Sequence, residues 1–327
     1  MQSEDSSLPQ VSIVVPVYNS ERFLDQCLAS LKAQTLAKED LEVLIINDGS
    51  TDGSQSIINK YVSENSNFRV IEQKNAGLFA ARKTGINNAK GRFVGWVDSD
   101  DFVEPTMFKT LFEIAQKKNS DLVYCDYEFY PKKIGTKAKW FREYKGYKDI
   151  SFIERNSQPW NKLVSRDLLE KLDIADLFLE CFDEAYIKCL LYAKNPISID
   201  KSFYYYRVGN GSMSSSYNNV QHYKNFINSS KNLRLAMNNL CQSDEYWKEY
   251  FDFRIIYYKL LTLIIAANSK DRITFYKLQK EKSNFKHNKH FKKIMIENYG
   301  LLKYFVMVKI LPLSYHLSAL ICRFAFN

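Results

Sequence analysis

Short apolar runs alternate with amphipathic stretches along the first hundred residues. Four runs rich in β-branched residues are predicted to be strands, at 11–17, 42–47, 68–72 and 92–97. Apolar side chains recur at helical spacing in the segments that follow the first three runs, near 23–31, 54–63 and 78–89. This β-α-β-α order predicts a mostly parallel sheet with helices on both faces. Such sheets bind ligands outside the carboxyl ends of their strands.

The rest of the chain continues with mixed elements and ends in helices. The middle third is expected to hold two strands, at 121–129 and 202–207, and three helical stretches, at 105–118, 160–172 and 184–193. The last third has helical periodicity at 219–240, 245–267 and 272–282. We therefore expect an α/β domain over 1–215, with halves at 1–110 and 111–215, followed by a helical region over 216–327.

The composition is that of a globular protein with a basic end. Of the 327 residues, 46% are apolar and 25% are charged, which excludes a disordered chain, a collagen-like chain and a polytopic membrane protein. The net charge of +9 is unevenly distributed, being −4 over 1–110, +2 over 111–215 and +11 over 216–327. The positive surplus therefore belongs to the last third and not to the predicted ligand-binding sheet.

Cysteine usage and the first residues favour a cytoplasmic protein. The six cysteines form no C-x-x-C pair, and the chain has only 4 histidines, so a structural zinc site is not expected. We interpret the cysteines as buried free thiols of a reducing compartment. The polar start, MQSEDSSLPQ, lacks the basic and apolar regions of a secretory signal.

Three carboxylates stand within four residues at the end of the fourth predicted strand. Asp98, Asp100 and Asp101 directly follow the apolar run 93–97. Such closely spaced carboxylates repel one another unless a cation or hydrogen-bond donors balance them. Asp98 and Asp100 suit Mg²⁺ or Mn²⁺ bridging a diphosphate. The alternative is an acidic helix N-terminus just before Pro105.

Polar residues also follow the second and third predicted strands. Asp48 can accept a hydrogen bond from a nucleobase, or it can cap the next helix. Asn75 and Arg82 place an amide and a guanidinium after the third strand, where the guanidinium can make planar contacts to a base or a phosphate. The alternative for Arg82 is a solvated arginine on a helix.

These motifs occur in one order, each after a predicted strand. The set consists of VVPVYN at 14–19, NDGSTD at 47–52, NAG and AAR within 75–82, and DSDD at 98–101. Together they resemble the nucleotide-sugar-binding half of the family 2 glycosyltransferases, which have a GT-A fold, a Rossmann-like α/β architecture. The resemblance is specific over 11–105 and looser to 215, and it does not usefully cover the last third.

The resemblance implies a donor site with a metal. The residues that match donor-binding positions are Pro16, Tyr18, Asp48, Asn75, Arg82, Asp98, Ser99 and Asp100. Asp98 and Asp100 match the family's D-x-D motif, which holds Mn²⁺ or Mg²⁺ on the diphosphate. Arg207 and Ser212 lie in a segment like the one that closes over the diphosphate, so they are expected to bind phosphate oxygens. A strand followed by a turn is compatible with that role.

The middle region implies an acceptor site and a general base. PWNKL at 159–163 resembles the family's W-N-K segment beside the acceptor, which implies acceptor contacts for Trp160 and Asn161. Trp160 as a core aromatic is the alternative. Relatives then carry an acidic pair, usually Glu-Asp, whose second member is the base. In this chain the order is reversed, and the alignment favours Glu184 as the base with its neighbour Asp183 as the second candidate.

The resemblance further implies an inverting, metal-dependent transferase of the hexosyl or N-acetylhexosaminyl type. The expected donor is a nucleotide-sugar, with UDP the most frequent nucleotide in the family. The expected acceptor is a glycan or a lipid-linked oligosaccharide of a bacterial cell-surface polysaccharide, such as a capsule. One alternative is a nucleotidyltransferase, although the first loop lacks the Gly-rich, basic sequence that such enzymes use. The other is a catalytically silent partner subunit.

The end of the chain is basic and apolar. Between 277 and 293 there are seven lysines and one acid, and apolar aromatic segments interrupted by Lys303, Lys309 and Pro312 follow. These interruptions disfavour a membrane-spanning helix, whereas the composition suits helices at an anionic membrane surface over 277–327. The enzyme would then be peripheral at the inner face of the cell membrane. A helix pair packed on the body is the alternative, and nucleic acid is not expected because no binding motif accompanies the lysines.

Overall fold

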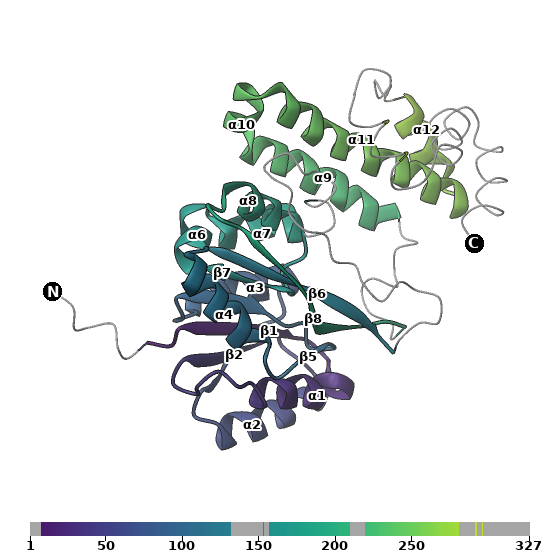
Figure 1. Ribbon diagram of the computed structural model, residues 1–327. Helices are drawn as coiled ribbons and strands as arrows, with labels where there is room; N and C mark the ends of the chain where they lie inside the picture. The colour runs from purple at the N-terminus through teal and green to yellow at the C-terminus, as the bar shows by residue number, and fades with distance from the viewer. Residues whose placement is uncertain are drawn as a thin grey trace. The chain divides into compact units, whose positions relative to one another are not determined.

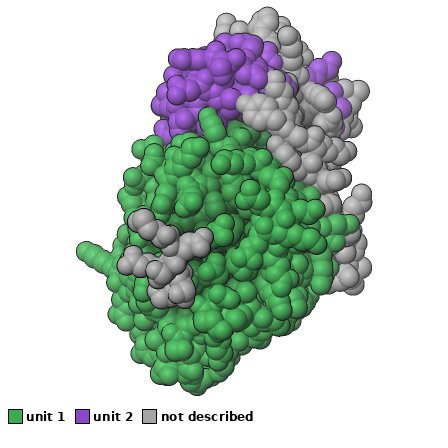
Figure 2. Space-filling model, turned by 60° about the vertical axis from the view of Figure 1, so that its left-hand side comes forward, with its two compact units in different colours: residues 1–208 green, residues 209–327 purple. Residues whose placement is uncertain are grey.

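A computed structural model describes residues 8–131, 157–209 and 220–280, together with Ile153, Lys292 and Ile296. The chain divides into two compact units, residues 1–208 and residues 209–327, which Figure 2 colours separately. Each unit has a hydrophobic cluster of its own. The boundary expected after residue 215 falls outside the described residues.

The first half of unit 1 is the parallel sheet that the sequence predicts. Its strands run parallel in the order β3-β2-β1-β4, and they are β1 Val11–Val17, β2 Leu41–Asn47, β3 Phe68–Glu72 and β4 Phe93–Trp96. Every residue of β1 and β2 is buried, because these apolar runs are covered on both faces. The helices of this half, visible in Figure 1, are α1 Glu21–Lys32, α2 Ser54–Glu64 and α3 Leu78–Asn88.

The second half of unit 1 extends the sheet on the far side of β4. Four strands complete the order β3-β2-β1-β4-β7-β6-β8-β5, and they are β5 Phe102–Val103, β6 Leu122–Tyr130, β7 Lys162–Ser165 and β8 Ile197–Arg207. β7 is antiparallel to β4 and β6, and β5 is antiparallel to β8, so the sheet becomes mixed beyond β4. The helices of this half are α4 Met107–Lys118, α6 Arg166–Lys171, α7 Ile174–Cys181 and α8 Ala185–Tyr192, with a short 3₁₀ turn, η1, at Phe182–Glu184.

Alternate side chains of the strands meet helices on opposite faces of the sheet. Ile13 and Val15 of β1 belong to a core cluster with side chains of α1, α2 and α4. On the other face, Val14 meets α3 at Gly85, where any side chain would overlap the valine methyl groups. The glycine therefore lets α3 lie directly on the sheet, and the helix positions the residues that it carries toward the strand ends.

The segment 160–172 differs from the predicted helix. It begins as strand β7, and it becomes helical only from Arg166. Pairing of Leu163 with Gly95 of β4 and Val123 of β6 places this short run inside the sheet, which overrides the helical spacing of its apolar residues. The Ser165 hydroxyl then accepts a hydrogen bond from the Leu168 N–H at 3.3 Å and caps α6.

The described part of unit 2 is helical, as expected. Its helices are α9 Val220–Ala236, α10 Asn238–Ser243, α11 Glu245–Asn268 and α12 Arg272–Lys280. The single helix predicted over 219–240 is thus two helices that meet at Met237. Among the residues that the structure describes, no helix is long and apolar enough to cross a membrane. The basic and apolar end beyond residue 280 lies outside the described residues, except for Lys292 and Ile296.

The cysteines within the described ranges are free and buried, as the sequence predicts. These are Cys27, Cys125, Cys181, Cys189 and Cys241. Burial raises the pKa of the Cys125 thiol to about 12, so this thiol stays protonated at neutral pH. Such cysteines act as small apolar side chains.

Candidate active site

The carboxyl ends of the four parallel strands bring the predicted donor residues to one edge of the sheet. Tyr18 follows β1, Asp48 follows β2, Asn75 lies beyond β3 and Asp98 lies beyond β4. Because parallel strands end on the same side, motifs that are far apart in the sequence converge there. Tyr18 is 50% exposed and Asn75 is exposed, whereas Pro16 is buried inside β1 and shapes the strand end.

Asp48 organises the loop that precedes α3. Its side chain is buried, and its carboxylate accepts hydrogen bonds from Gln73 Nε2 at 2.7 Å, the Ala76 N–H at 2.9 Å and the Gly77 N–H at 2.8 Å. Gly77 has φ +91°, a backbone conformation that favours glycine. The alternative of Asp48 as the cap of the next helix is wrong, because the N-cap of α2 is Gly53 and no side chain caps this helix.

The turn at 98–101 separates its three carboxylates. Asp101 is 1% exposed and points into unit 1, where it accepts hydrogen bonds from the Tyr204 hydroxyl at 2.8 Å and the Arg207 N–H at 2.7 Å. Asp98 and Asp100 are only half-buried, and Ser99 Oγ lies 2.6 Å from Ser20 Oγ. Burial, followed by the negative charge of Asp98, raises the pKa of Asp100 to about 6. The turn thus places a poorly solvated carboxyl group, that of Asp100, close to a second carboxylate.

Arg82 bridges two carboxylates from distant parts of the chain. Its Nη2 donates to Asp98 Oδ1 at 3.0 Å, and its Nη1 donates to Asp183. The guanidinium is 1% exposed and lies over the Phe79 ring. The sequence predicted that Arg82 contacts the donor. In the structure its guanidinium is instead paired with carboxylates of the protein. The alternative of a solvated arginine is wrong as well.

The acidic pair after α7 is oriented by η1. Asp183 points to Arg82 and its side chain is 39% exposed, whereas Glu184 is 3% exposed at the start of α8. Burial raises the pKa of Asp183, and the Arg82 charge acts in the opposite direction. Of the two neighbours, the structure brings Asp183 and not Glu184 to the Arg82–Asp98 pair, the reverse of the order that the alignment favours.

Trp160 and Asn161, the predicted acceptor residues, lie in the core. Trp160 is 8% exposed and stacks on Tyr204 at a ring-centroid distance of 4.5 Å. Asn161 is 1% exposed, its Nδ2 donates to the Cys125 carbonyl at 2.6 Å, and its Oδ1 accepts from the Lys162 ammonium. The structure differs from the prediction of direct acceptor contacts, because both side chains are buried and contact other residues of unit 1. Trp160 is a core aromatic, the alternative left open by the sequence.

Arg207 is enclosed beside the turn at 98–101. Its Nε donates to the Asp100 carbonyl at 2.7 Å, and its Nη2 donates to Gln26 at 2.6 Å. The guanidinium carbon lies 4.7 Å from the Phe23 ring centroid and 5.1 Å from that of Tyr130. Arg207 is 8% exposed, so it supports the backbone of Asp100 in this structure and presents little surface to a phosphate. Ser212, its predicted companion, lies outside the described residues.

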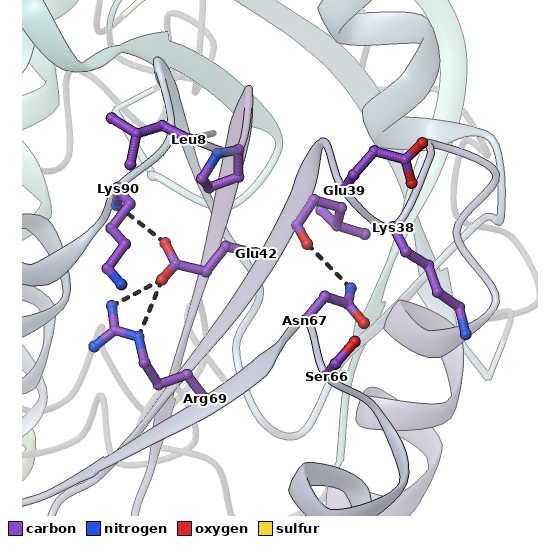
Figure 3. Close-up of a pocket in the computed structure, with 10 residues that line it drawn as sticks. Leu8, Lys38, Glu39, Glu42, Ser66, Asn67, Arg69 and Lys90 are labelled. Carbon is purple, nitrogen blue, oxygen red and sulfur yellow. Dashed lines mark hydrogen bonds and ion pairs between the residues drawn. The ribbon is translucent and has the colours of Figure 1, made fainter. Parts of the chain in front are cut away.

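A cavity of about 510 Å³ lies at the other end of the parallel strands, where β2 and β3 begin (Figure 3). Glu42 at its wall accepts hydrogen bonds from Arg69 Nε at 3.1 Å, Arg69 Nη2 at 2.8 Å and the Lys90 N–H at 3.0 Å. The charges of Glu42 and Arg69 in this wall are therefore paired with each other. None of the predicted donor residues lines this cavity, so it is not the candidate active site.

Comparison with known proteins assigns the fold and the family. The Glycosyl transferase family 2 model matches residues 12–173. A protein of Borreliella burgdorferi named cholesterol galactosyltransferase is 30% identical over 300 residues, which are 84% of this chain and 81% of that protein.

The chain belongs to glycosyl transferase family 2.

Other known proteins are similar to part of the chain or to its fold. The uncharacterized glycosyltransferase EpsJ of Bacillus subtilis is 35% identical over 180 residues, so the match spans about half of each protein, 51% of both. The crystal structure of Staphylococcus aureus TarS 1–349 in complex with UDP-GlcNAc superimposes with a TM-score of 0.70 at 19% identity, covering 96% of this chain and 92% of that one. The fold is therefore α/β of the GT-A type with a helical C-terminal region, as predicted.

Replacement of Arg82 tests the bridge between the two carboxylates. Arg82→Met leaves Asp98 and Asp183 without their buried partner, so we expect the free energy of unfolding to fall by about 3–5 kcal/mol. Lys83→Met is the matched control, because Lys83 pairs with the exposed Asp176 and should cost about 1 kcal/mol or less. Urea unfolding of both variants measures the difference, and equal losses would contradict the bridging role.

Proposed function

We propose that this enzyme transfers a sugar from a nucleotide-sugar to a hydroxyl group of a glycan or a lipid-linked oligosaccharide, in the synthesis of a bacterial cell-surface polysaccharide. The observation that carries this proposal is the joining of Asp183 to Asp98 through Arg82, at the edge of the sheet where the parallel strands end. A carboxylate that can take a proton thus stands beside the D-x-D pair. The resemblance in sequence supports the polysaccharide pathway.

The donor is proposed to be a UDP-sugar with a hexosyl or N-acetylhexosaminyl group. The support is the UDP-GlcNAc bound by TarS, whose fold this chain shares, and the galactosyl transfer named for the Borreliella burgdorferi relative. On this proposal the exposed ring of Tyr18 and the loop held by Asp48 face the nucleotide. Tyr18 offers an aromatic face for stacking, and the loop offers the exposed amide of Asn75.

Asp183 is the proposed general base, in place of Glu184. A base must reach the acceptor hydroxyl, and the Asp183 side chain is 39% exposed whereas Glu184 is 3% exposed. The neighbouring Arg82 charge favours the ionised form of Asp183, which is the form that can accept a proton. The hydroxyl loses its proton to this carboxylate as its oxygen bonds to the anomeric carbon. The bond to the nucleoside diphosphate breaks in the same in-line step, which inverts the anomeric configuration.

Asp98 and Asp100 are the residues proposed to hold Mn²⁺ or Mg²⁺. No group of three His, Cys, Asp or Glu residues suited to a metal occurs in the described ranges. Two carboxylates fit an ion that keeps several waters and takes its other ligands from substrate phosphates. A divalent cation held there would offset the burial and the negative charge of Asp98, which together raise the pKa of Asp100. When bound, the ion would stabilise the charge that develops on the leaving diphosphate.

The alternatives are weakened by different observations. Membership of the family argues against a nucleotidyltransferase, because the matched region 12–173 carries the glycosyltransferase motifs. A catalytically silent partner subunit would have no need for a partly exposed carboxylate held beside the D-x-D pair by a buried arginine. Turnover of a nucleotide-sugar by the isolated chain would exclude both.

The acceptor is proposed to reach the enzyme at an anionic membrane surface. Helix α12 packs Phe275 against Leu263 and Ala267 of α11. Its other side presents Ile273, 85% exposed, and Tyr276, 45% exposed, at a spacing that places both on one face. Arg272, Lys277 and Lys280 accompany them, and the helix contains no acid. Apolar side chains flanked by cations suit an anionic lipid interface, which supports the peripheral location proposed for this enzyme.

A thermal-shift screen of nucleotide-sugars tests the donor. Full-length enzyme with Mn²⁺ should melt at a higher temperature with its own UDP-sugar, because a ligand that binds only the native state stabilises it. UDP should give a smaller shift, and sugars carried on other nucleotides should give none. Hydrolysis of the stabilising donor would then be measured directly. If ATP or CTP raised the melting temperature and no nucleotide-sugar did, the result would instead favour the nucleotidyltransferase.

Substitution of the acidic pair identifies the base. Asp183→Asn should lower kcat for sugar transfer at least about a hundredfold, because the acceptor hydroxyl loses its proton acceptor. Donor affinity should change little. Glu184→Gln is the matched control, and its buried side chain predicts a far smaller effect on kcat. A large loss in Glu184→Gln with nearly normal turnover in Asp183→Asn would reverse the assignment.

Vesicle flotation tests the exposed face of α12. The full-length chain should float with vesicles that contain phosphatidylglycerol and not with pure phosphatidylcholine vesicles. Ile273→Glu should weaken this binding about tenfold or more, because it removes an exposed apolar side chain that would enter the lipid and adds a charge that anionic lipid repels. Leu235→Glu is the matched control, since Leu235 is 68% exposed on α9 and undergoes the same change of charge. Equal binding by the two variants would refute the role of α12.

A further inference from the structure

The hydroxyl of Tyr204 joins the D-x-D turn to strand β8. It accepts a hydrogen bond from the Asp98 N–H at 3.2 Å and donates one to Asp101 Oδ2 at 2.8 Å. The whole side chain is buried, and its ring stacks on Trp160 at an interplanar angle of 27°. A single phenol oxygen thus contacts the first residue of the turn through the backbone and the last residue through its carboxylate.

Asp101 completes the attachment of the turn. Its N–H donates to the Asp98 carbonyl at 3.0 Å, which closes the turn on itself. Its second carboxylate oxygen accepts from the Arg207 N–H at 2.7 Å. Immediately after the turn, Phe102 and Val103 of β5 pair with Tyr205 and Tyr204 of β8. The turn is therefore held to β8 at its start and at its end, and Asp100 stands between the two attachments.

We propose that Tyr204 is a positioning residue for the metal-holding aspartates. Its hydroxyl fixes the backbone at Asp98 and, through Asp101, the end of the turn, so that the carboxylates of Asp98 and Asp100 present themselves together at the edge of the sheet. This inference rests on the proposed function, because it assigns the turn a divalent cation. Tyr204 itself touches neither substrate nor metal on this account.

Removal of this one oxygen has a specific physical consequence. In Tyr204→Phe the ring and its stacking on Trp160 remain, so the core keeps its shape. The Asp98 N–H and Asp101 Oδ2 each lose a buried hydrogen-bond partner, which makes the closed turn less favourable relative to open forms. The two aspartates then hold a common geometry for a smaller fraction of the time, and the affinity for a cation falls with that fraction.

Tyr205 provides the matched control on the same strand. Its hydroxyl donates to the Glu104 carboxylate, beyond the turn, and its ring stacks on Phe102 with the centroids 4.7 Å apart. Tyr205→Phe therefore removes a hydrogen bond of the same type, from a tyrosine to a carboxylate, at the neighbouring position. A general weakening of β8 would affect both variants, whereas positioning of the turn predicts an effect of Tyr204→Phe alone.

The experiment combines amide hydrogen exchange with Mn²⁺ binding, on the full-length chain. We expect exchange of the Asp98 amide to be at least about tenfold faster in Tyr204→Phe than in the wild type and unchanged in Tyr205→Phe. Titration with Mn²⁺ in the presence of UDP, followed by electron paramagnetic resonance, should give a Kd about tenfold higher in Tyr204→Phe only.

Two results would overturn the inference. One is an exchange rate of the Asp98 amide in the wild type as high as that of an open loop. This measurement does not depend on the folding of any variant. The other is an equal affinity of the two variants for Mn²⁺. This would occur if Tyr204→Phe bound Mn²⁺ as tightly as the wild type, or if Tyr205→Phe lost as much affinity as Tyr204→Phe. If the wild type binds neither Mn²⁺ nor Mg²⁺, the metal proposal fails, and with it the role of Tyr204 in metal binding. The exchange data would then report only the attachment of the turn.

Discussion

A buried guanidinium is the interaction on which the candidate site depends. Arg82 is 1% exposed, and its charge can stay in the interior only because Asp98 and Asp183 pair with it. These partners come from the end of β4 and from η1, so one ion cluster fixes three segments relative to one another. Gly85, one turn further along α3, lets that helix lie directly on Val14 and so sets the position from which Arg82 reaches both carboxylates.

The motif residues divide into a framework and an exposed edge. Asp48, Asp101 and Arg207 each make at least one hydrogen bond with a backbone group beside the site. Because a buried polar group without a partner is costly, these bonds hold the loops in one conformation. Asp98 and Asp100, together with the exposed Tyr18, remain at the surface of this framework. Several side chains that the sequence predicted at the donor are thus engaged in hydrogen bonds within the protein.

The sequence predicted the parallel half of the sheet closely and the rest less well. Strands β1 to β4 follow the predicted runs to within a residue at each end, because apolar segments covered on both faces leave a strong local pattern. Strand β7 was missed, since Leu163 is held there by pairing with Gly95 and Val123, which no local pattern reports. The sequence left two roles for Trp160, an acceptor contact or a core aromatic. Its stacking on Tyr204, a residue of a distant strand, makes it a core residue.

By itself the sequence determined the order of strands and helices in the first hundred residues, the family, and the convergence of its motifs at the carboxyl ends of parallel strands. Hydrophobic periodicity and strand order are local properties, and they decide which ends of the strands lie together. Only the tertiary structure decided that Asp183 faces Arg82 while its neighbour Glu184 is buried, because Arg82 and Asp183 are separated by 101 positions in the sequence. Two adjacent carboxylates are equivalent in a sequence. The backbone of η1 and the partner it meets across the fold make them different.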